Sequence, residues 1–288
     1  MIVARSPAEL EPARRAVALG TFDGLHVGHR RVIEAALAAG LRSTVVTFDP
    51  HPRKTLGEPV ALLATTERRL ELLADLGVED VLLLRFDEEL AALTAETFAE
   101  SILRGIGAEV VAAGNGFRFG EGRSGDLDLL ERLGFDVRRV PLVDNASSSH
   151  VRRLIEAGNV EQAARLLGRP TEVEGTVIGG DRRGATLGFP TANLELPEDL
   201  LVPALGVYAG SALGHRAAVS IGTNPHYGGT ERRVEAYLLD YEGDLYGQRL
   251  VVELWERLRD EAAFESEAAL VDAIASDVER TRAARRPG

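Results

Sequence analysis

Two histidines in a glycine-rich segment are the residues of this sequence best suited to phosphate chemistry. His26 and His29 are three residues apart in the run Gly20-Thr21-Phe22-Asp23-Gly24-Leu25-His26-Val27-Gly28-His29. The run follows an apolar stretch and leads into a helical pattern, which places backbone amides where a helix N-terminus can bind an anion. The spacing also fits surface histidines or a metal pair. The surrounding residues favour a phosphate site that involves Gly20, Phe22, Asp23, Gly24, His26, Gly28 and His29.

Three further loops place polar and aromatic side chains near the ends of expected strands. The segment Thr47-Phe48-Asp49-Pro50-His51-Pro52 stands at the carboxyl end of a strand, where open α/β sheets bind their ligands. Its two prolines alone would indicate only a rigid turn. The second loop, 114–120, carries Phe117 and Phe119. The third loop, 147–152, begins a helix with serine hydroxyls, which are also common as purely structural caps.

Oxygen-bearing side chains in the second half of the chain could bind a hard cation. Thr191 and Asn193 are two residues apart on an expected strand and therefore point to the same face. Their oxygens suit Mg²⁺ that carries nucleotide phosphates, although an ordinary polar strand face would have the same pattern. They follow a glycine-rich loop with Gly180 and Gly184, whose backbone amides could hold phosphates.

Glu235 is a carboxylate of this half that could act as a base. It lies in Val234-Glu235-Ala236-Tyr237-Leu238-Leu239-Asp240, whose alternation places Glu235, Tyr237 and Leu239 on one face of a strand. A carboxylate among such neighbours is either at the mouth of a barrel or functional. A solvated glutamate on a strand is the simpler alternative.

Strand and helix patterns alternate along the first 145 or so residues, which contain the histidine segment and the three loops. Apolar runs typical of strands are separated by helical patterns, which predicts a parallel sheet covered by helices, an α/β fold of the Rossmann-like kind. The helical spacing stops at Gly40 in one segment and at Gly77 in another. The expected strands are 16–19, 43–48, 81–84, 110–113 and 137–140.

The second half has a different pattern. It begins with a helical stretch over 147–167, in which Asn159 and Gln162 have the spacing of a helix cap and its reciprocal partner. Short strands with glycine-rich turns then predict an antiparallel barrel or sandwich. An amphipathic stretch over about 266–283 is expected to be a terminal helix. The expected strands are 173–178, 207–213, 217–221, 233–241 and 250–255.

The composition limits the kinds of partner. The 288-residue chain has a net charge of −12, which opposes non-specific binding to nucleic acid. Lys54 is its only lysine, so a Gly-x-x-x-x-Gly-Lys phosphate loop is excluded. No apolar run approaches the roughly 20 residues that span a bilayer, and the N-terminus lacks a signal-peptide pattern. With no cysteine, the sequence predicts a cytoplasmic protein without a membrane or nucleic-acid partner.

Taken together, the four loops of the first half resemble the adenylyltransferase domain of bacterial bifunctional riboflavin kinase/FAD synthetases. In that family a Gly-x-Phe-Asp-Gly-x-His-x-Gly-His motif is followed by Thr-Phe-x-Pro-His-Pro, Phe-Arg-Phe-Gly and Ser-Ser-Thr-x-x-Arg. The resemblance implies that the phosphate of FMN attacks the α-phosphate of ATP, with release of pyrophosphate and formation of FAD. It implies that His26 and His29 are catalytic and contact the ATP phosphates with Ser148 and Arg152. The flavin contacts that it implies are Pro50, His51, Phe117 and Phe119.

Two residues of the first half depart from the family pattern. Gly116 stands where the family usually has Asp or Asn, and Ser149 replaces Thr. The change at Ser149 is conservative. Gly116 removes a polar side chain from the expected site, so an alternative stays open in which this domain is an impaired nucleotide-binding module beside a working kinase.

The second half resembles the riboflavin kinase domain of the same family. The resemblance implies a six-stranded barrel that transfers the γ-phosphoryl group of ATP to the ribityl 5′-hydroxyl of riboflavin. It implies Mg²⁺ on Thr191 and Asn193, Glu235 as the general base, and Arg259 near the flavin or the nucleotide. Four residues, Ala185, Ser220, His226 and Tyr237, replace the Arg, Asn, Thr and His that are usual there.

These resemblances predict an FMN adenylyltransferase domain over residues 1–168 and a riboflavin kinase domain over residues 169–288. The expected substrates are riboflavin, FMN and ATP, with Mg²⁺ as cofactor and with FMN and FAD as intermediate and product. A weak homo-oligomer is left open. The alternative from another class is a flavin-binding protein without turnover, which the presence of Thr191, Asn193 and Glu235 disfavours.

Overall fold

The structure, a computed structural model, describes residues 1–143, 146–179, 187–223 and 232–288. Contacts within the chain divide it into two compact units. Unit 1 comprises Met1–Val60 and Thr65–Ser147, and unit 2 comprises Ala61–Ala64 and Ser148–Gly288. The helical stretch before residue 168 therefore groups with unit 2, whereas the functional boundary between residues 168 and 169 stays a prediction.

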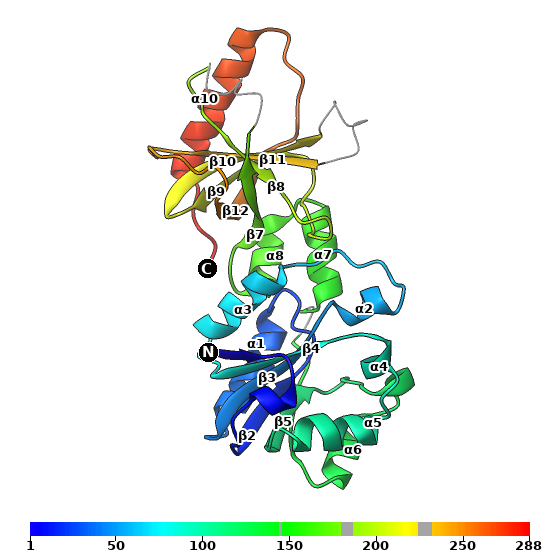
Figure 1. Ribbon diagram of the computed structural model, residues 1–288. Coiled ribbons are helices and arrows are strands. Elements are labelled where there is room, and N and C mark those ends of the chain that lie inside the picture. The colour runs from blue at the N-terminus through cyan, green and yellow to red at the C-terminus, as the bar shows by residue number, and fades with distance from the viewer. Residues whose placement is uncertain (144–145, 180–186, 224–231) are drawn as a thin grey trace. The chain divides into compact units, whose positions relative to one another are not determined.

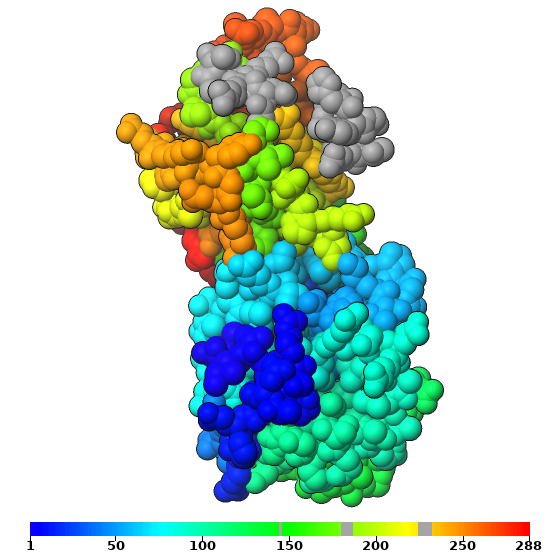
Figure 2. Space-filling model, viewed as in Figure 1, coloured from blue at the N-terminus to red at the C-terminus, as the bar shows by residue number. Residues whose placement is uncertain are grey.

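Unit 1 contains a six-stranded parallel sheet with the order β1-β4-β3-β2-β5-β6. All five expected strands are present, because helices cover both faces of a parallel sheet and its strands are therefore nearly continuous apolar runs. The sequence patterns do not predict β1, an exposed edge strand in the dark-blue segment of Figure 2. The strands, shown in Figure 1, are β1 (Ile2–Ala4), β2 (Arg15–Leu19), β3 (Arg42–Asp49), β4 (Asp80–Arg85), β5 (Ala108–Gly114) and β6 (Asp136–Val140).

Each face of the sheet has its own hydrophobic core. On one face α1 and α3 bury Ile33 and Leu73 against the strands, and on the other face α5, the π-helical turn η2 and α6 pack. None of the helices in the described parts of the chain is both long enough and apolar enough to cross a membrane. The helical segments of unit 1 are η1 (Pro7–Glu9), α1 (Val27–Leu37), α2 (Pro52–Thr55), α3 (Thr66–Asp75), α4 (Glu88–Ala91), α5 (Ala95–Phe98), η2 (Ala99–Arg104), η3 (Glu121–Arg123) and α6 (Leu127–Arg132).

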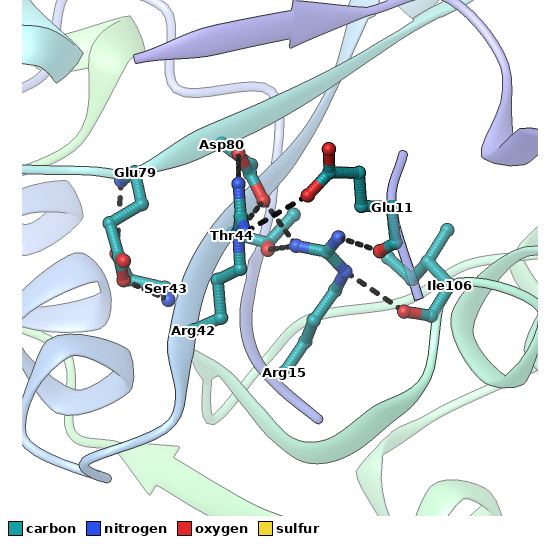
Figure 3. Close-up of polar contacts among 8 residues, drawn as sticks. All are labelled: Glu11, Arg15, Arg42, Ser43, Thr44, Glu79, Asp80 and Ile106. Carbon is teal, nitrogen blue, oxygen red and sulfur yellow. Dashed lines mark hydrogen bonds and ion pairs between the residues drawn. The ribbon is translucent and has the colours of Figure 1, made fainter. Parts of the chain in front are cut away.

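A buried ion pair between Arg15 and Asp80 holds together the amino ends of the central strands (Figure 3). Asp80 also accepts a hydrogen bond from Nε of Arg42 at 2.7 Å, and Arg15 donates to the carbonyls of Ile106 at 2.9 Å and Glu11 at 2.6 Å. Burial alone would raise the pKa of Asp80, but the hydrogen bonds from Arg42 and Arg15 outweigh it and lower that pKa below its ordinary value. These residues begin their strands, so the network lies at the sheet edge opposite the predicted ligand site.

Unit 2 begins with two helices, α7 (Ser148–Glu156) and α8 (Val160–Leu167). Asn159 occupies the N-cap position of α8, but its side chain makes no capping hydrogen bond. The predicted reciprocal cap with Gln162 is therefore wrong, because Asn159 has φ −83° and ψ 60° rather than the extended backbone of a capping residue. The apolar faces of the two helices form a small core with Leu63, Val151, Ile155, Ala163, Leu167 and Leu201.

The rest of unit 2 is a closed antiparallel barrel with the strand order β10-β11-β8-β7-β12-β9. Alternation places Val234 and Ala236 in the barrel core and Glu235 and Tyr237 on the outer face. Leu239 does not share that face, because β11 ends one residue earlier. The elements are β7 (Thr171–Ile178), β8 (Ala192–Glu195), β9 (Gly206–Ala212), β10 (His215–Thr223), β11 (Arg232–Leu238), β12 (Arg249–Arg259) and the expected terminal helix α10 (Glu267–Ala283).

Candidate active sites

The segment from Gly20 to His29 forms a compact turn between β2 and α1. Phe22, Gly24 and Leu25 have φ values of 51°, 79° and 39°, so three residues of this short turn adopt left-handed backbone. A Cβ atom at Gly20 would lie 3.1 Å from the ring of Phe22, a tight contact that glycine avoids. Asp23 is only 2% exposed. The turn therefore leads into α1 with the carboxylate of Asp23 buried within it.

The rings of His26 and His29 stack at the N-terminus of α1, with centroids 3.6 Å apart and planes inclined by 18°. His26 is the N-cap residue, and its Nδ1 accepts a hydrogen bond from the backbone N–H of His29 at 3.3 Å. A Cβ atom at Gly28 would lie 3.1 Å from the ring of His26. The structure thus brings both predicted histidines together at the positive end of a helix, where an anion is favoured. Phosphate binding by them stays a prediction.

The second predicted loop begins where β3 ends, next to this turn. β2 and β3 are neighbouring parallel strands, so Pro50 and His51 stand at the same carboxyl edge as Gly20. The peptide bond between Asp49 and Pro50 is cis. His51 is the N-cap residue of α2, and its Nδ1 accepts a hydrogen bond from the backbone N–H of Arg53 at 3.2 Å.

Arg69 of α3 joins these two loops, although no sequence pattern singles it out. Its Nη1 donates to the carbonyl of Thr21 at 3.0 Å and its Nη2 to the carbonyl of Phe48 at 2.9 Å. Arg69 is only 5% exposed. Burial lowers the pKa of the Arg69 guanidinium, while the nearby carboxylates of Asp23 and Asp49 act in the opposite direction.

The third predicted loop follows β5, on the other side of β2. The chain switches direction across the sheet between β2 and β5, and ligands of open α/β sheets bind beyond the strand ends at such a point. Phe117 and Phe119 stack with centroids 6.1 Å apart. Phe119 is 7% exposed and packs against Phe98 in the core of unit 1, so it has a packing role, and the flavin contacts of the two rings stay a prediction.

Ser148 and Arg152 lie on α7, in the unit other than that of the two histidines. Nε of Arg152 donates to the carbonyl of Ala61 at 2.7 Å, within the short segment that also belongs to unit 2. This hydrogen bond anchors the side chain of Arg152. The role of Ser148 and Arg152 at the triphosphate stays a prediction.

The residues predicted for phosphoryl transfer come together on the outer wall of the barrel. Oγ1 of Thr191 donates to Oε2 of Glu235 at 3.1 Å. Asn193 on β8 is the direct cross-strand partner of Glu235 on β11. The barrel therefore places a hydroxyl, an amide oxygen and a carboxylate side by side.

Arg233 is a member of this cluster that sequence reasoning missed. It donates to Oδ1 of Asn193 from Nε at 2.9 Å and from Nη2 at 2.6 Å, and its Nε lies 2.9 Å from Oε1 of Glu235. The signal was present, because Arg233 and Glu235 are two residues apart and must share one face of β11. A guanidinium thus contacts the same oxygens that are predicted to bind a cation or a proton.

A pocket of about 410 Å³ adjoins this cluster, which is within the usual size range of small-molecule sites. Arg259, the last residue of β12, makes hydrogen bonds of 3.0 and 2.8 Å to Oδ2 of Asp277 on α10. The ring of Tyr237 meets the ring of Phe189 edge to face. The pocket is lined by barrel residues and by α10, including Leu187, Phe189, Thr191, Asn193, Ser220, Arg233, Glu235, Tyr237, Arg259, Phe264, Leu270, Ile274 and Asp277.

Four positions of the predicted site region lie outside the described residues: Gly180, Gly184, Ala185 and His226.

Comparisons with known proteins find relatives for both halves of the chain. A family model for FAD synthetase matches residues 8–152, and a model for riboflavin kinase matches residues 167–285. A bifunctional riboflavin kinase/FMN adenylyltransferase from Listeria monocytogenes serovar 1/2a is 35% identical, over 93% of this chain and 92% of the relative. One from Bacillus subtilis strain 168 is 33% identical, over 93% and 91%. A crystal structure described as a macrolide-efflux protein from Streptococcus pneumoniae is 33% identical and covers 98% of both chains, with a TM-score of 0.87.

The matches together span both units, and the relatives align along nearly their whole length. The chain therefore belongs to the family of bifunctional riboflavin kinase/FMN adenylyltransferases.

Proposed function

We propose that unit 2 phosphorylates riboflavin with Glu235 as the general base and with Thr191 and Asn193 as ligands of Mg²⁺. The observation that supports this most directly is the convergence of the three side chains beside the pocket on the outer wall of the barrel. Hydroxyl and amide oxygens are hard donors, which Mg²⁺ accepts while it keeps waters and substrate phosphates in its shell. When bound, Mg²⁺ would neutralise part of the charge of the triphosphate.

The step at the kinase site is a transfer of one proton and one phosphoryl group. Glu235 accepts the proton of the ribityl hydroxyl while that oxygen forms a bond to the γ-phosphorus of ATP. The bond between the γ-phosphorus and the bridging oxygen breaks, and ADP leaves. The hydrogen bond from Thr191 and the ion pair with Arg233 hold the carboxylate in place for this step. Arg259, fixed by Asp277, lines the pocket in which the flavin would lie.

In unit 1 we propose that FMN is adenylylated at the turn between β2 and α1. A phosphate oxygen of FMN attacks the α-phosphorus of ATP, the bond to the β-phosphate oxygen breaks, and pyrophosphate leaves. The chain provides no covalent intermediate in this scheme. His26, His29 and the N-terminus of α1 stabilise the phosphate charge that develops, and the loops orient the two substrates.

We place the functional boundary between residues 168 and 169, directly after the left-handed Gly168 that ends α8. The absence of cysteine supports a reducing compartment, and we propose the cytoplasm. The proposed partners are small molecules, namely riboflavin, FMN and ATP with Mg²⁺.

Product analysis of the full chain tests the function. With riboflavin, ATP and MgCl₂, chromatography should resolve FMN and then FAD, with ADP and pyrophosphate as the other products. With FMN and ATP alone as substrates, FAD and pyrophosphate should form in equal amounts. FMN without FAD would leave only the kinase and favour an impaired unit 1. The absence of both products would reject the proposal for both units.

A further inference from the structure

Thr47 near the end of β3 and Thr66 and Arg69 on α3 hold two segments of unit 1 at a fixed separation. These segments are the turn after β2 and the end of β3 with the loop that follows it. The carbonyl of Thr21, in the turn after β2, accepts hydrogen bonds from both Nη1 of Arg69 and Oγ1 of Thr47, each at 3.0 Å. The carbonyl of Phe48, at the end of β3, accepts from Nη2 of the same guanidinium at 2.9 Å. One side chain therefore binds both loops.

The contacts continue into the loop that contains Pro50. Oγ1 of Thr66, on the first turn of α3, donates to Oδ1 of Asp49 at 3.0 Å. α3 thus holds Asp49 through Thr66 and the carbonyl before it through Arg69. The N-terminal part of α3 therefore contacts the last two residues of β3.

Burial of the Arg69 guanidinium lowers the stability of the folded state. The residue is 5% exposed, and its Nε is buried without a hydrogen-bond partner among the described residues. A buried polar group that lacks a partner destabilises the folded state, and desolvation opposes a buried charge. Leucine or methionine would cover the same helix face at lower cost, so the guanidinium is explained by the carbonyls that it fixes.

We propose that Arg69 is a positioning residue of the adenylyltransferase reaction, which sets the turn Gly20–His29 and the loop Asp49–Pro52 at the separation that aligns FMN with ATP. The inference rests on the proposed function of unit 1. Arg69 acts through the backbone of the two loops, and no contact with substrate is assigned to it. A shift of about 1 Å between reacting groups can lower a rate about 100-fold, so the loss of this residue should act on turnover.

The test compares Arg69→Met and Arg69→Lys with the wild-type chain in steady-state FMN adenylylation. Arg69→Met should lower kcat by about 10- to 100-fold and change KM for ATP by less than about threefold, because the hydrogen bond of Arg69 in that turn goes to Thr21 and not to His26 or His29, which are proposed to contact ATP. Arg69→Lys retains the charge but reaches fewer carbonyls, so it should recover part of the lost kcat. Riboflavin phosphorylation by the same molecules should stay at the wild-type rate.

Arg42→Met is the matched control. Arg42 begins β3 and pairs with Asp80, which begins β4, at the sheet edge opposite the ligand loops. Its replacement should lower the melting temperature without changing kcat. Thr47→Val provides a second variant that removes only one donor to Thr21 and should lower kcat in the same direction by a smaller factor. It keeps the test decisive should Arg69→Met fail to fold.

The outcomes separate the inference from the function on which it rests. An Arg69→Met enzyme with kcat for FAD formation within about twofold of wild type would overturn the inference alone. Equal losses in both activities would also overturn it, since the damage would then be general. A wild-type chain that forms no FAD would overturn the proposed function of unit 1 and the inference with it.

Discussion

The guanidinium of Arg233 binds the side-chain oxygen of Asn193 through two hydrogen bonds, from Nε at 2.9 Å and from Nη2 at 2.6 Å. Both residues face the pocket on the outer wall of the barrel. Asn193 is a proposed ligand of Mg²⁺, so a cation and the guanidinium compete for one oxygen. Arg233 therefore holds the oxygens of this cluster in place and also opposes the binding of a second positive charge beside them.

Replacement of Arg233 by glutamine should lower the Mg²⁺ concentration that gives half-maximal riboflavin phosphorylation. Release of about 1 kcal/mol of competing interaction corresponds to a decrease of about fivefold. A titration of MgCl₂ at fixed ATP measures this concentration, and the electron paramagnetic resonance of Mn²⁺ with ADP measures binding without turnover. Arg249→Gln, which breaks a pair with Glu174 elsewhere on the barrel, is the control. An unchanged Mg²⁺ dependence would argue against the competition.

Replacement of Glu235 by glutamine should abolish most riboflavin phosphorylation. Loss of a general base lowers rates by about 100- to 10,000-fold, and glutamine retains an oxygen that can accept the hydrogen bond from Thr191. Formation of FAD from added FMN should be unaffected, because Glu235 lies on β11 of the barrel and is not among the residues proposed for adenylylation. Single-turnover measurements of both reactions on one preparation test this. Full phosphorylation by the variant would refute the assigned base.

Gly116→Asn should increase the rate of FAD formation. No heavy atom lies within 4 Å of a Cβ built at Gly116, so a side chain fits there. One added hydrogen bond of about 0.5–1.5 kcal/mol to a substrate in the transition state would raise kcat/KM by about two- to tenfold. Gly288→Asn, at a position that is likewise open and has no left-handed backbone, is the control. An unchanged kcat/KM would show that the departure at Gly116 does not limit adenylylation.

The sequence predicts those parts of the fold and site that depend on local patterns. Five parallel strands and the barrel strands follow from apolar runs and alternation, whereas the grouping of Thr191 with Glu235 in one site follows only from the family resemblance. The three-residue edge strand β1 is too short to give a pattern. Its position at the edge of the sheet becomes evident only from its pairing with β4 in the structure.

Two arginines with proposed roles illustrate why the rest could not be predicted. The contact of Arg233 with Asn193 depends on the pairing of β8 with β11, which joins residues 40 positions apart. Arg69 is an ordinary charged residue of a helix by composition, and its partners are backbone carbonyls 48 and 21 positions away. Side-chain to backbone bonds of this range leave no residue-type signature, because every residue has a carbonyl group.

The buried pair of Arg15 with Asp80 makes the stability of unit 1 depend on pH in acid. The pKa of Asp80 is lowered in the folded protein from an ordinary value of 3.8, so its charged form stabilises the fold at every pH above that value. The stabilisation is lost as the pH falls below 3.8 and through the pKa of the folded state. Asp80→Asn leaves the buried charge of Arg15 without its partner and should cost about 3–5 kcal/mol at pH 7.

Urea unfolding of wild type and Asp80→Asn at pH 7, 5, 4 and 3 checks the sign of this effect. The difference in the free energy of unfolding should be constant from pH 7 to 5 and should narrow below pH 4, because the wild type alone loses a stabilising charge. Circular dichroism reports on both units, and the fluorescence of Trp255, the single tryptophan, reports on unit 2. Glu109→Gln, which removes the exposed partner of Arg14, should change stability by less than about 1 kcal/mol at any of these pH values. A difference that stays constant down to pH 3 would show that Asp80 does not carry the acid dependence.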